Sequence, residues 1–482
     1  MKQDHIIQKV FVEITVNNKE KALSIKEDIN SFLSVDVFPQ IEKYINALEY
    51  KLEGHTLQIP RLELDLDVKS GSLDTELKDK IVQLFKEELS EIVKSTEISN
   101  QETENDSKAY WVHNQEKMIQ TFIYFLENGS MPWWNSDKKS ISFLEPEIFD
   151  SLISTHNFEK SIIPVLSKQY VKDRMINQLS DDQIAQLCLT VLKNKPLKIN
   201  LEQNIISYIS KLDHKDRFIT WQLILNALSE YLSSSKTNLQ EYLLQHLSKI
   251  EATGFLQTKT NRQNLKTIVQ IFPFVKENEI VESIKNQVID SPENITETLI
   301  ETINLENETA YEDLSQNNNG HYIQNAGLIL IHPFLKIFFE HCNLIHPKTQ
   351  QLTDPELCAH LLHYIATGKT NAPEYDMVFE KFLCNIPINK SINKYIKLSR
   401  KHKTQAKKVI ESVQHNWNPM KKASVALLQN EFFQRSGKLV ITDSDYTLNV
   451  ERKTQDILLD KLTWGISFVK LPWQKKFIFV NW

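Results

Sequence analysis

Histidine and cysteine side chains gather in one stretch of the chain, where they could bind a metal ion. They are His332, His341, Cys342, His346, Cys358, His360, His363 and Cys384. Zinc in proteins takes four nitrogen or sulfur ligands in tetrahedral geometry, usually supplied as two closely spaced pairs. His360 and His363 share a helix face at i, i+3 spacing, and His341 with His346 offers a second pair. One interpretation is therefore a zinc site in a metal-dependent hydrolase.

The same residue types also suit a protein interior. Cys342 and Cys358 occupy apolar helical positions, where cysteine behaves as a small hydrophobic residue. A Cys/His nucleophilic site would need an activating geometry that the sequence does not indicate. The cysteines form no CxxC pair, which is typical of a protein from a reducing cytoplasm. We predict no catalytic residue, no bound metal and no cofactor, and keep the metal-dependent hydrolase as an alternative.

Acidic residues alternate along one predicted strand. Glu63, Asp65 and Asp67 share a face, so their carboxylates could converge on a metal ion or share a proton. The alternate positions are all leucine or valine, and no second ligand-bearing strand completes a site. We interpret the carboxylates as the solvated face of an edge strand.

A basic run also stands out in the sequence. It consists of Arg400, Lys401, Lys403, Lys407 and Lys408. Nucleic-acid sites combine a concentrated basic face with aromatic residues, but this run has no interleaved aromatics and the chain has a net charge of −6. The run is interpreted as a solvated helix face, and no nucleic-acid partner is predicted.

Glycine is scarce, and its spacing excludes several enzyme motifs. The 482 residues contain 9 glycines, and none are spaced as in a dinucleotide fingerprint, a P-loop or a Gly-x-Ser-x-Gly elbow. Nothing in the chain therefore indicates a nucleotide-driven enzyme or a serine hydrolase. Few glycines also mean few tight turns, which predicts long helices with short polar connections.

Length and composition indicate a soluble protein of several domains. A chain of 482 residues is too long for one core, and hydrophobic and charged contents of 41% and 24% are ordinary for globular proteins. Residues 1–10 lack the apolar core and cleavage site of a signal peptide. Residues 326–345 form the most apolar stretch, but charged and histidine residues interrupt it. We predict a cytoplasmic protein with no membrane insertion.

The periodicity of apolar residues predicts a mainly α fold with α+β ends. Alternation predicts strands over 10–16 and 62–68, and helical spacing between and after them completes a small N-terminal sheet with helices. Prolines divide the middle of the chain into short helices. The predicted organisation is an α+β domain over 1–94, a linker over 95–108, an all-helical region over 109–303, a linker over 304–319, a helical region over 320–435 and a β region over 436–482.

Local signals place elements within the last two regions. Thr353 and Glu356 have capping-box spacing around Pro355, and Gly368 suits the end of the helix that follows. Strands are expected over 438–441 and 446–450, joined by a turn at 442–445, and over 466–471 and 477–480.

Tryptophans are the best candidates for contact with a partner. Trp133 and Trp134 are adjacent, and Trp464, Trp473 and Trp482 crowd the C-terminal region. Tryptophan is enriched in interface hot spots because its ring buries a large area while keeping one hydrogen-bond donor. Core packing explains these residues equally well.

Residues 325–335, NAGLILIHPFL, resemble a segment of one known family. It is the tape measure proteins of contractile injection systems, the phage-tail-like particles of the antifeeding-prophage type. The segment carries Asn325, Gly327, His332 and Pro333 at the positions of the family's N-A-G-L and H-P-F-L elements.

Several further segments resemble the same family in the same order. FFQRSGKL around Gly437, WGIS from Trp464, LPW with Pro472 and Trp473, and VNW ending at Trp482 match its C-terminal elements. HYIATG (363–368) and LCNIP (383–387) also match, although Asn385 stands where the family element has glycine and puts the backbone turn there in question. The match is looser over 1–134, where IPRLELDL (59–66) and MPWW (131–134) are similar.

The resemblance implies assembly rather than catalysis. Such a protein would help to set the length of the inner tube and sheath as the particle polymerises on its baseplate, with inner-tube and baseplate proteins as partners. It would be made in the cytoplasm and could become part of a released particle. The distributed prolines argue against one long helical ruler, so a compact baseplate or tube-assembly factor is an alternative within the same family.

Overall fold

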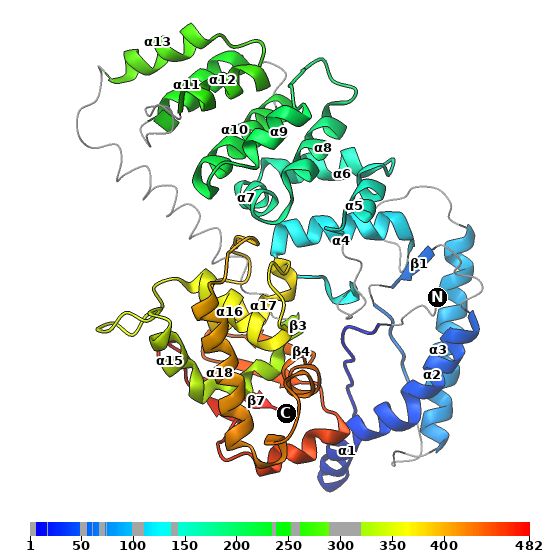
Figure 1. The fold of residues 1–482 in the computed structure, drawn as a ribbon. Coiled ribbons are helices and arrows are strands. Elements are labelled where there is room, and N and C mark those ends of the chain that lie inside the picture. Colours follow the sequence, from blue (N-terminus) through cyan, green and yellow to red (C-terminus); the bar gives the residue numbers. More distant parts are fainter. Residues whose placement is uncertain are drawn as a thin grey trace. The chain divides into compact units, whose positions relative to one another are not determined.

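A computed structural model shows a mainly helical chain with two small sheets among the residues that it describes, which confirms the predicted fold class (Figure 1). The residues that it describes are 6–16, 18–48, 55–59, 61–66, 73, 75–98, 110–135, 143–233, 238–251, 261–288 and 320–482. The chain divides into two compact units, Met1–Gln120 and Thr121–Trp482. No helix in the described ranges is both long enough and apolar enough to span a bilayer.

In its described residues, the first unit consists of helices and one pair of strands. Its elements are α1 (Lys19–Ser31), the π-helical turn η1 (Phe32–Val37), α2 (Phe38–Leu48), β1 (His55–Gln58), α3 (Thr75–Ile98) and β2 (Tyr110–His113). Helix α1 begins where the Asn18 side chain accepts a hydrogen bond from the Glu20 amide at 2.8 Å. A small core of Phe32, Val37, Ile41 and Val82 joins η1, α2 and α3. Strands β1 and β2 pair antiparallel.

The strands of this unit are not the predicted ones. Residues 10–16 and 61–66 form no strand, and β2 lies in the region predicted to be all-helical. The alternation of residue types is still seen in side-chain exposure, because the leucines of 61–66 are half-buried whereas Glu63 and Asp65 are exposed. A strand also needs hydrogen bonds from a neighbour, and the described residues supply none to this segment. Asp67 and Val68 lie outside the described residues.

The predicted first linker is helical at its start. Helix α3 continues through Ile98, so residues 95–98 extend it, and residues 99–108 lie outside the described residues, as do all of 304–319. The predicted domain boundaries remain predictions.

Short helices fill the part of the second unit that precedes residue 289. They are α4 (Asn114–Asn128, which begins in the first unit), η3 (Trp133–Asn135), α5 (Pro146–Ile153), α6 (Phe158–Ile162), η4 (Ile163–Ser167), α7 (Gln169–Gln178), α8 (Asp181–Leu192), α9 (Gln203–Ile209), α10 (His214–Ser233), α11 (Leu239–Glu251), α12 (Asn261–Ile271) and α13 (Glu277–Val288). Prolines delimit several of them, as predicted: Pro146 opens α5 and Pro164 lies in the first turn of η4.

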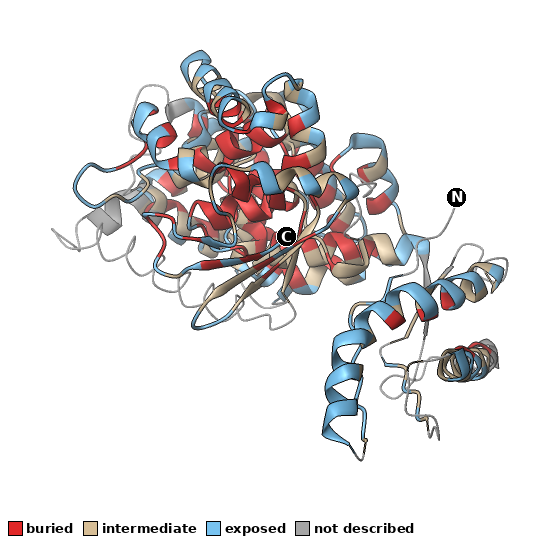
Figure 2. Ribbon diagram, turned by 90° about the horizontal axis from the view of Figure 1, so that it is seen from below, coloured by how far each residue is buried: buried red, intermediate tan, exposed pale blue. Residues whose placement is uncertain are grey.

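Residues 320–482 combine helices with a sheet. The elements are β3 (His321–Ile323), η5 (Ala326–Ile331), α15 (His332–His341), α16 (Pro355–Thr367), η6 (Glu374–Asp376), α17 (Val378–Leu383), α18 (Arg400–Asn416), η7 (Asn418–Met420), α19 (Val425–Leu428), η8 (Gln429–Phe433), β4 (Gly437–Ile441), β5 (Tyr446–Val450), η9 (Thr454–Lys461), β6 (Phe468–Val469) and β7 (Ile478–Asn481). Apolar residues from almost all of them form one buried core (Figure 2).

The C-terminal sheet has the strand order β3-β4-β5-β7-β6. The hairpin of β4 and β5 is the predicted one, and its turn is held by Thr442, whose amide donates to the Asp445 carbonyl at 3.0 Å. Strand β7 pairs parallel with β5 and antiparallel with β6, so it is inserted between two strands that precede it in the chain. The short strand β3 was not predicted.

Helix α16 begins one residue later than predicted. Asp354, not Thr353, is the N-cap, and its carboxylate accepts from the Leu357 amide at 3.0 Å. Glu356 does not complete a capping box but accepts from the Asn393 amide at 3.1 Å. The predicted end is confirmed, because Gly368 adopts a left-handed φ of +71°. Asn385 also has a positive φ, +58°, so asparagine supports the turn for which glycine is suited.

Two glycines of the family-like segments provide a test of packing. A Cβ atom on Gly327 would lie 1.6 Å from the Phe432 carbonyl oxygen, whereas one on Gly465 would meet nothing within 4 Å. Gly327→Ala should therefore force η5 and η8 apart and destabilise the protein by about 3 kcal/mol or more. Gly465→Ala should change stability by less than about 0.5 kcal/mol. Urea unfolding followed by circular dichroism measures both, and equal midpoints would contradict the close approach.

Candidate functional site

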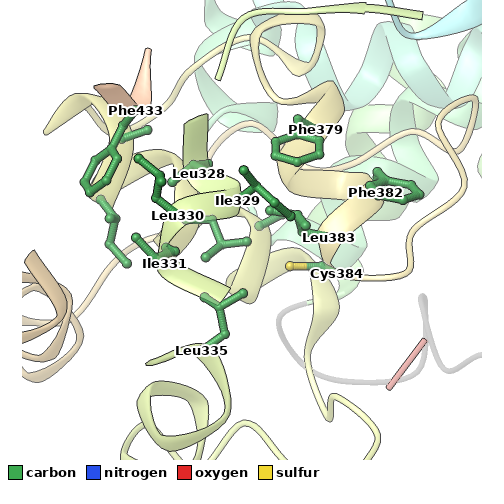
Figure 3. Packing of buried hydrophobic residues seen from close by; sticks show 14 of the residues in the cluster. Leu328, Ile329, Leu330, Ile331, Leu335, Phe379, Phe382, Leu383, Cys384 and Phe433 are labelled. Atoms are coloured by element: carbon green, nitrogen blue, oxygen red, sulfur yellow. The ribbon is translucent and has the colours of Figure 1, made fainter. Parts of the chain in front are cut away.

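The family-like segment from Asn325 forms the centre of the C-terminal core. Every residue of the 3₁₀ helix η5 is buried. Figure 3 shows its side chains between Phe379, Phe382 and Leu383 of α17 and Phe433 of η8. A segment enclosed in this way has no face left for a partner, so its sequence is explained by packing inside the chain.

Asn325 anchors η5 through a buried polar cluster. Its side-chain amide donates to Glu380 Oε1 at 2.7 Å and to the Asp376 carbonyl at 3.2 Å. The same Glu380 oxygen lies 2.9 Å from His363 Nδ1. Burial raises the pKa of Asp376 to about 6. The nearby His363 acts in the opposite direction and lowers this pKa, but by less than burial raises it. The cluster thus joins η5 to α16 and α17 rather than lining a cavity.

Two C-terminal tryptophans donate hydrogen bonds to main-chain carbonyls at helix ends. The indole N–H of Trp464 donates to the Leu330 carbonyl at 3.0 Å, and that of Trp473 donates to the Leu383 carbonyl at 2.7 Å. These carbonyls lie at the ends of η5 and α17, where helices leave acceptors without an internal partner. Trp473 is buried and Trp464 half-buried. Each ring is therefore a packing residue and a hydrogen-bond donor at once.

Trp482 is held by a third arrangement. Its indole N–H donates to Asp456 Oδ2 at 3.0 Å, and the Arg435 guanidinium lies 5.8 Å from the centre of its ring. Arg435 is fully buried and also forms an ion pair with Asp456. Arg452 donates to the Trp482 carbonyl at 2.8 Å. The end of β7 is thereby fixed to η9.

The remaining family-like positions are distributed around this core. A Cβ atom on Gly437 would lie 2.7 Å from that of Ala326, so glycine is needed where β4 passes η5. His332 begins α15, with Nδ1 donating to the Ile329 carbonyl at 3.0 Å. Pro333 and Pro472 are exposed. These two prolines are the most accessible of the singled-out residues in this part.

The other predicted tryptophan pair lies in the helical part of the same unit. Trp133 and Trp134 form η3, are both half-buried, and have ring centres 5.7 Å apart in an edge-to-face arrangement. Trp134 also packs edge-on against Tyr124 of α4 at 5.8 Å. Their half-buried state fits either interpretation made from the sequence, so contact with a partner remains a prediction for this pair.

A buried ion network, absent from the sequence predictions, joins the helical part to residues 374–392. Arg174 of α7, Glu374 and Lys381 all have fully buried side chains. Arg174 Nε donates to Glu374 Oε2 at 3.2 Å, and Lys381 forms an ion pair with Glu374 Oε1. The two cations also donate to the carbonyls of Leu126, Ile388, Asn389 and Lys390. Every charge in the network thus has a partner.

Hydrogen bonds between uncharged groups add to this contact, which we call the joint between α7 and residues 374–392. The Gln178 side chain donates to the Ile392 carbonyl at 2.7 Å and accepts from the Glu374 amide at 2.9 Å. Asn177 donates to the Ser391 hydroxyl at 3.0 Å. No local signal could reveal these contacts, because the partners lie about 200 residues apart and buried arginine is the exception among charged residues.

The histidine and cysteine side chains do not form a metal site among the described residues. There, no three His, Cys, Asp or Glu residues are grouped so as to hold a metal ion. His360 Nε2 lies 2.8 Å from the Asn393 carbonyl, and His363 bonds to Glu380. Burial raises the pKa of Cys342 to about 11 and that of Cys384 well above its usual value. A protonated thiol is a poor nucleophile and a poor metal ligand.

The two charged clusters are largely exposed. Glu63 forms an ion pair with Arg61, and both are more than two-thirds exposed, at 70% and 82%. The basic run lies on α18, where Lys401, Lys407 and Lys408 are exposed. Surface pairs of this kind contribute little to stability.

Comparison with known proteins identifies the family. A family model described as "contractile injection system tape measure protein" matches residues 4–482. The chain belongs to this family. No curated protein and no solved structure matches it. The match also covers the middle of the chain, where none of the similar segments described above lies.

Membership assigns this tape measure protein a structural role in a contractile injection system, with partners in the particle. The residues singled out by their resemblance to the family (Trp133, Trp134, Asn325, Gly327, His332, Pro333, Gly437, Trp464, Pro472, Trp473 and Trp482) are mostly used in the packing of its own fold. Direct contact of any of them with a partner stays a prediction.

The ion network predicts a large difference between two Glu→Gln variants. Glu374→Gln leaves Arg174 and Lys381 buried without a counter-charge and should cost about 3–5 kcal/mol. Glu127→Gln removes the partly exposed pair with Lys168 and should cost less than about 1 kcal/mol. Urea unfolding of both variants checks this, and similar midpoints would show that the buried network does not stabilise the fold.

The burial of His360 predicts that the stability of the folded protein depends on pH. Burial lowers its pKa from 6.5 to about 4, so the folded protein keeps it neutral while the unfolded chain takes up a proton below pH 6.5. The contribution of the neutral His360 side chain to the free energy of unfolding is therefore lost as pH falls from 6.5 towards 4. Relative to His360→Gln, which cannot titrate, the natural protein should lose up to about 2 kcal/mol between pH 6.5 and 5. Parallel stability profiles for the two proteins over this range would contradict the assignment.

Proposed function

We propose that this tape measure protein is a non-enzymatic assembly component that sets the length of the inner tube and sheath of its particle. The match of the family model to residues 4–482 carries the proposal. The protein would act in the cytoplasm, where the particle polymerises, and could remain in the particle after release. Its partners would be the inner-tube and baseplate proteins.

Within this proposal, residues 109–303 measure length and residues 320–482 dock onto other particle proteins. The second part supports a docking role because it has an extensive core of its own. The helices α11, α12 and α13 support a measuring role, since they pack mainly on one another and on α9 and α10. They could therefore separate from the rest without opening the ion network around Arg174.

A compact baseplate or tube-assembly factor is a second candidate. The observation that favours it is the joint between α7 and residues 374–392, since extension of that region would separate buried charges. Among the described residues of the helical part, the longest helix is α10, which has 20 residues and spans about 30 Å, so no described helix of this part is a long ruler.

Deletion of residues 238–303 should shorten the particles. The deletion removes α11, α12 and α13 with the residues that follow them, and leaves α4 to α10 and the ion network in place. If this stretch measures as helix, particle length should fall by about 100 Å, and tandem duplication of the same residues should add as much. Negative-stain electron microscopy measures the length distributions in cells that carry each variant.

The two variants separate the candidate functions. Uniform particles that are shorter with the deletion and longer with the duplication would support length setting. Unchanged length in both would overturn it and favour the compact assembly factor. If the deletion abolishes particles, the duplication alone decides, because it removes no part of the chain.

A further inference from the structure

A groove with a basic wall runs between α16, α18 and α19. It has a volume of about 510 Å³ and is lined by Tyr364, Gly368, Arg400, Lys403, Thr404, Lys407, Ile410, Val425 and Gln429. Tyr364, Ile410 and Val425 give it apolar surface, and three cations of α18 line one side. No carboxylate is among the lining residues.

The cations of this groove share one face of α18. Arg400, Lys403 and Lys407 follow one another at helical spacing, so their side chains project in the same direction. Lys403 lies over the Tyr364 ring at 5.6 Å. Lys407 is 3.9 Å from Glu411, and both of these side chains are more than half exposed. Within the described part of the chain, Arg400 and Lys403 form no ion pair.

The complementary charge occurs in the chain itself. Residues 290–313 contain eight Asp or Glu residues and no Lys or Arg. This segment therefore carries a charge of −8, whereas the whole chain has a net charge of −6, so the rest of the chain has a net charge of +2. Glu293, Glu297 and Glu301 recur every four positions, close to the spacing of the groove cations. These residues lie outside the described part of the structure.

The chain length allows the acidic segment to reach the groove. Its end at residue 313 precedes Asn325, whose amide lies 3.5 Å from His363 Nδ1 on α16. His363 is adjacent to Tyr364, which lines the groove. Residues 321–323 are fixed in β3, so residues 314–320, which span at most about 25 Å, connect the segment to the C-terminal fold, and this reach slightly exceeds the length of about 20 Å expected for α16. The other end of the segment follows α13, which ends at Val288.

We propose that the groove binds the chain's own acidic segment, residues 290–313, with its carboxylates on Arg400, Lys403 and Lys407 and its apolar residues against Tyr364, Ile410 and Val425. The arguments are charge complementarity, the absence of a lining carboxylate, and tethering, which gives the segment a high effective concentration at the groove.

Photo-cross-linking of the full-length chain tests the contact. A benzophenone amino acid replaces Thr404, which is exposed, lines the groove and donates only to the Arg400 carbonyl. After irradiation and digestion, mass spectrometry identifies the attached peptide, which should come from residues 290–313 of the same molecule. Arg400→Glu with Lys403→Glu should lower the yield about fivefold, and adding Glu297→Lys with Glu301→Lys should restore it.

A matched control keeps the test specific. Lys401→Glu with Lys408→Glu makes the same charge change on the same helix, but neither residue lines the groove, and Lys401 lies close enough to influence Cys342. This variant should leave the yield unchanged. Cross-links to another part of the chain, to a second copy or to another protein would overturn the proposal. Equal loss in both double variants, or no cross-link to 290–313, would overturn it as well.

Discussion

The burial of Arg174, Glu374 and Lys381 is the constraint on which the second unit depends. Charges removed from water must be paired and fully hydrogen-bonded, and here one carboxylate faces two cations. The surplus positive charge is met by main-chain carbonyls from the end of α4 and from residues 388–390. Even Gly129 is tied to the network, since a Cβ atom there would lie 2.5 Å from Glu374 Oε1.

This constraint bears on how a folded chain can act in a long particle. The network and the neighbouring hydrogen bonds tie α7 and the end of α4 to residues 374–392. The helices beyond α10 have no part in the network. They are held by apolar contacts such as those of Leu243 and Leu247 and by a few hydrogen bonds, such as that of Tyr208 to Asn264 at 2.6 Å. Apolar contacts are non-directional and can be replaced by a partner's surface, whereas the charge network has one geometry. Separation of α11 to α13 in the particle, as proposed above, would leave the charge network intact.

Local sequence signals predicted the elements whose causes are local. The β4–β5 hairpin, the left-handed Gly368 and the proline-delimited helices follow from a few neighbouring residues. The strands predicted at 10–16 and 62–68 did not form where described, because pairing depends on a distant partner. The roles of Trp464 and Trp473 as donors to helix-end carbonyls could not be predicted, since Trp464 and Leu330 are more than one hundred residues apart.

The place of β7 in its sheet has a consequence for biosynthesis. Because β7 pairs with β5 and β6 but follows both along the chain, a ribosome-bound chain that already contains β6 still has a gap in its sheet. Until β7 is synthesised, β5 presents an unpaired edge, the kind of surface on which nascent chains aggregate. Completion of this sheet therefore waits until β7 has been synthesised and released from the ribosome. A cell that builds these particles has reason to shield the newly made chain during that interval.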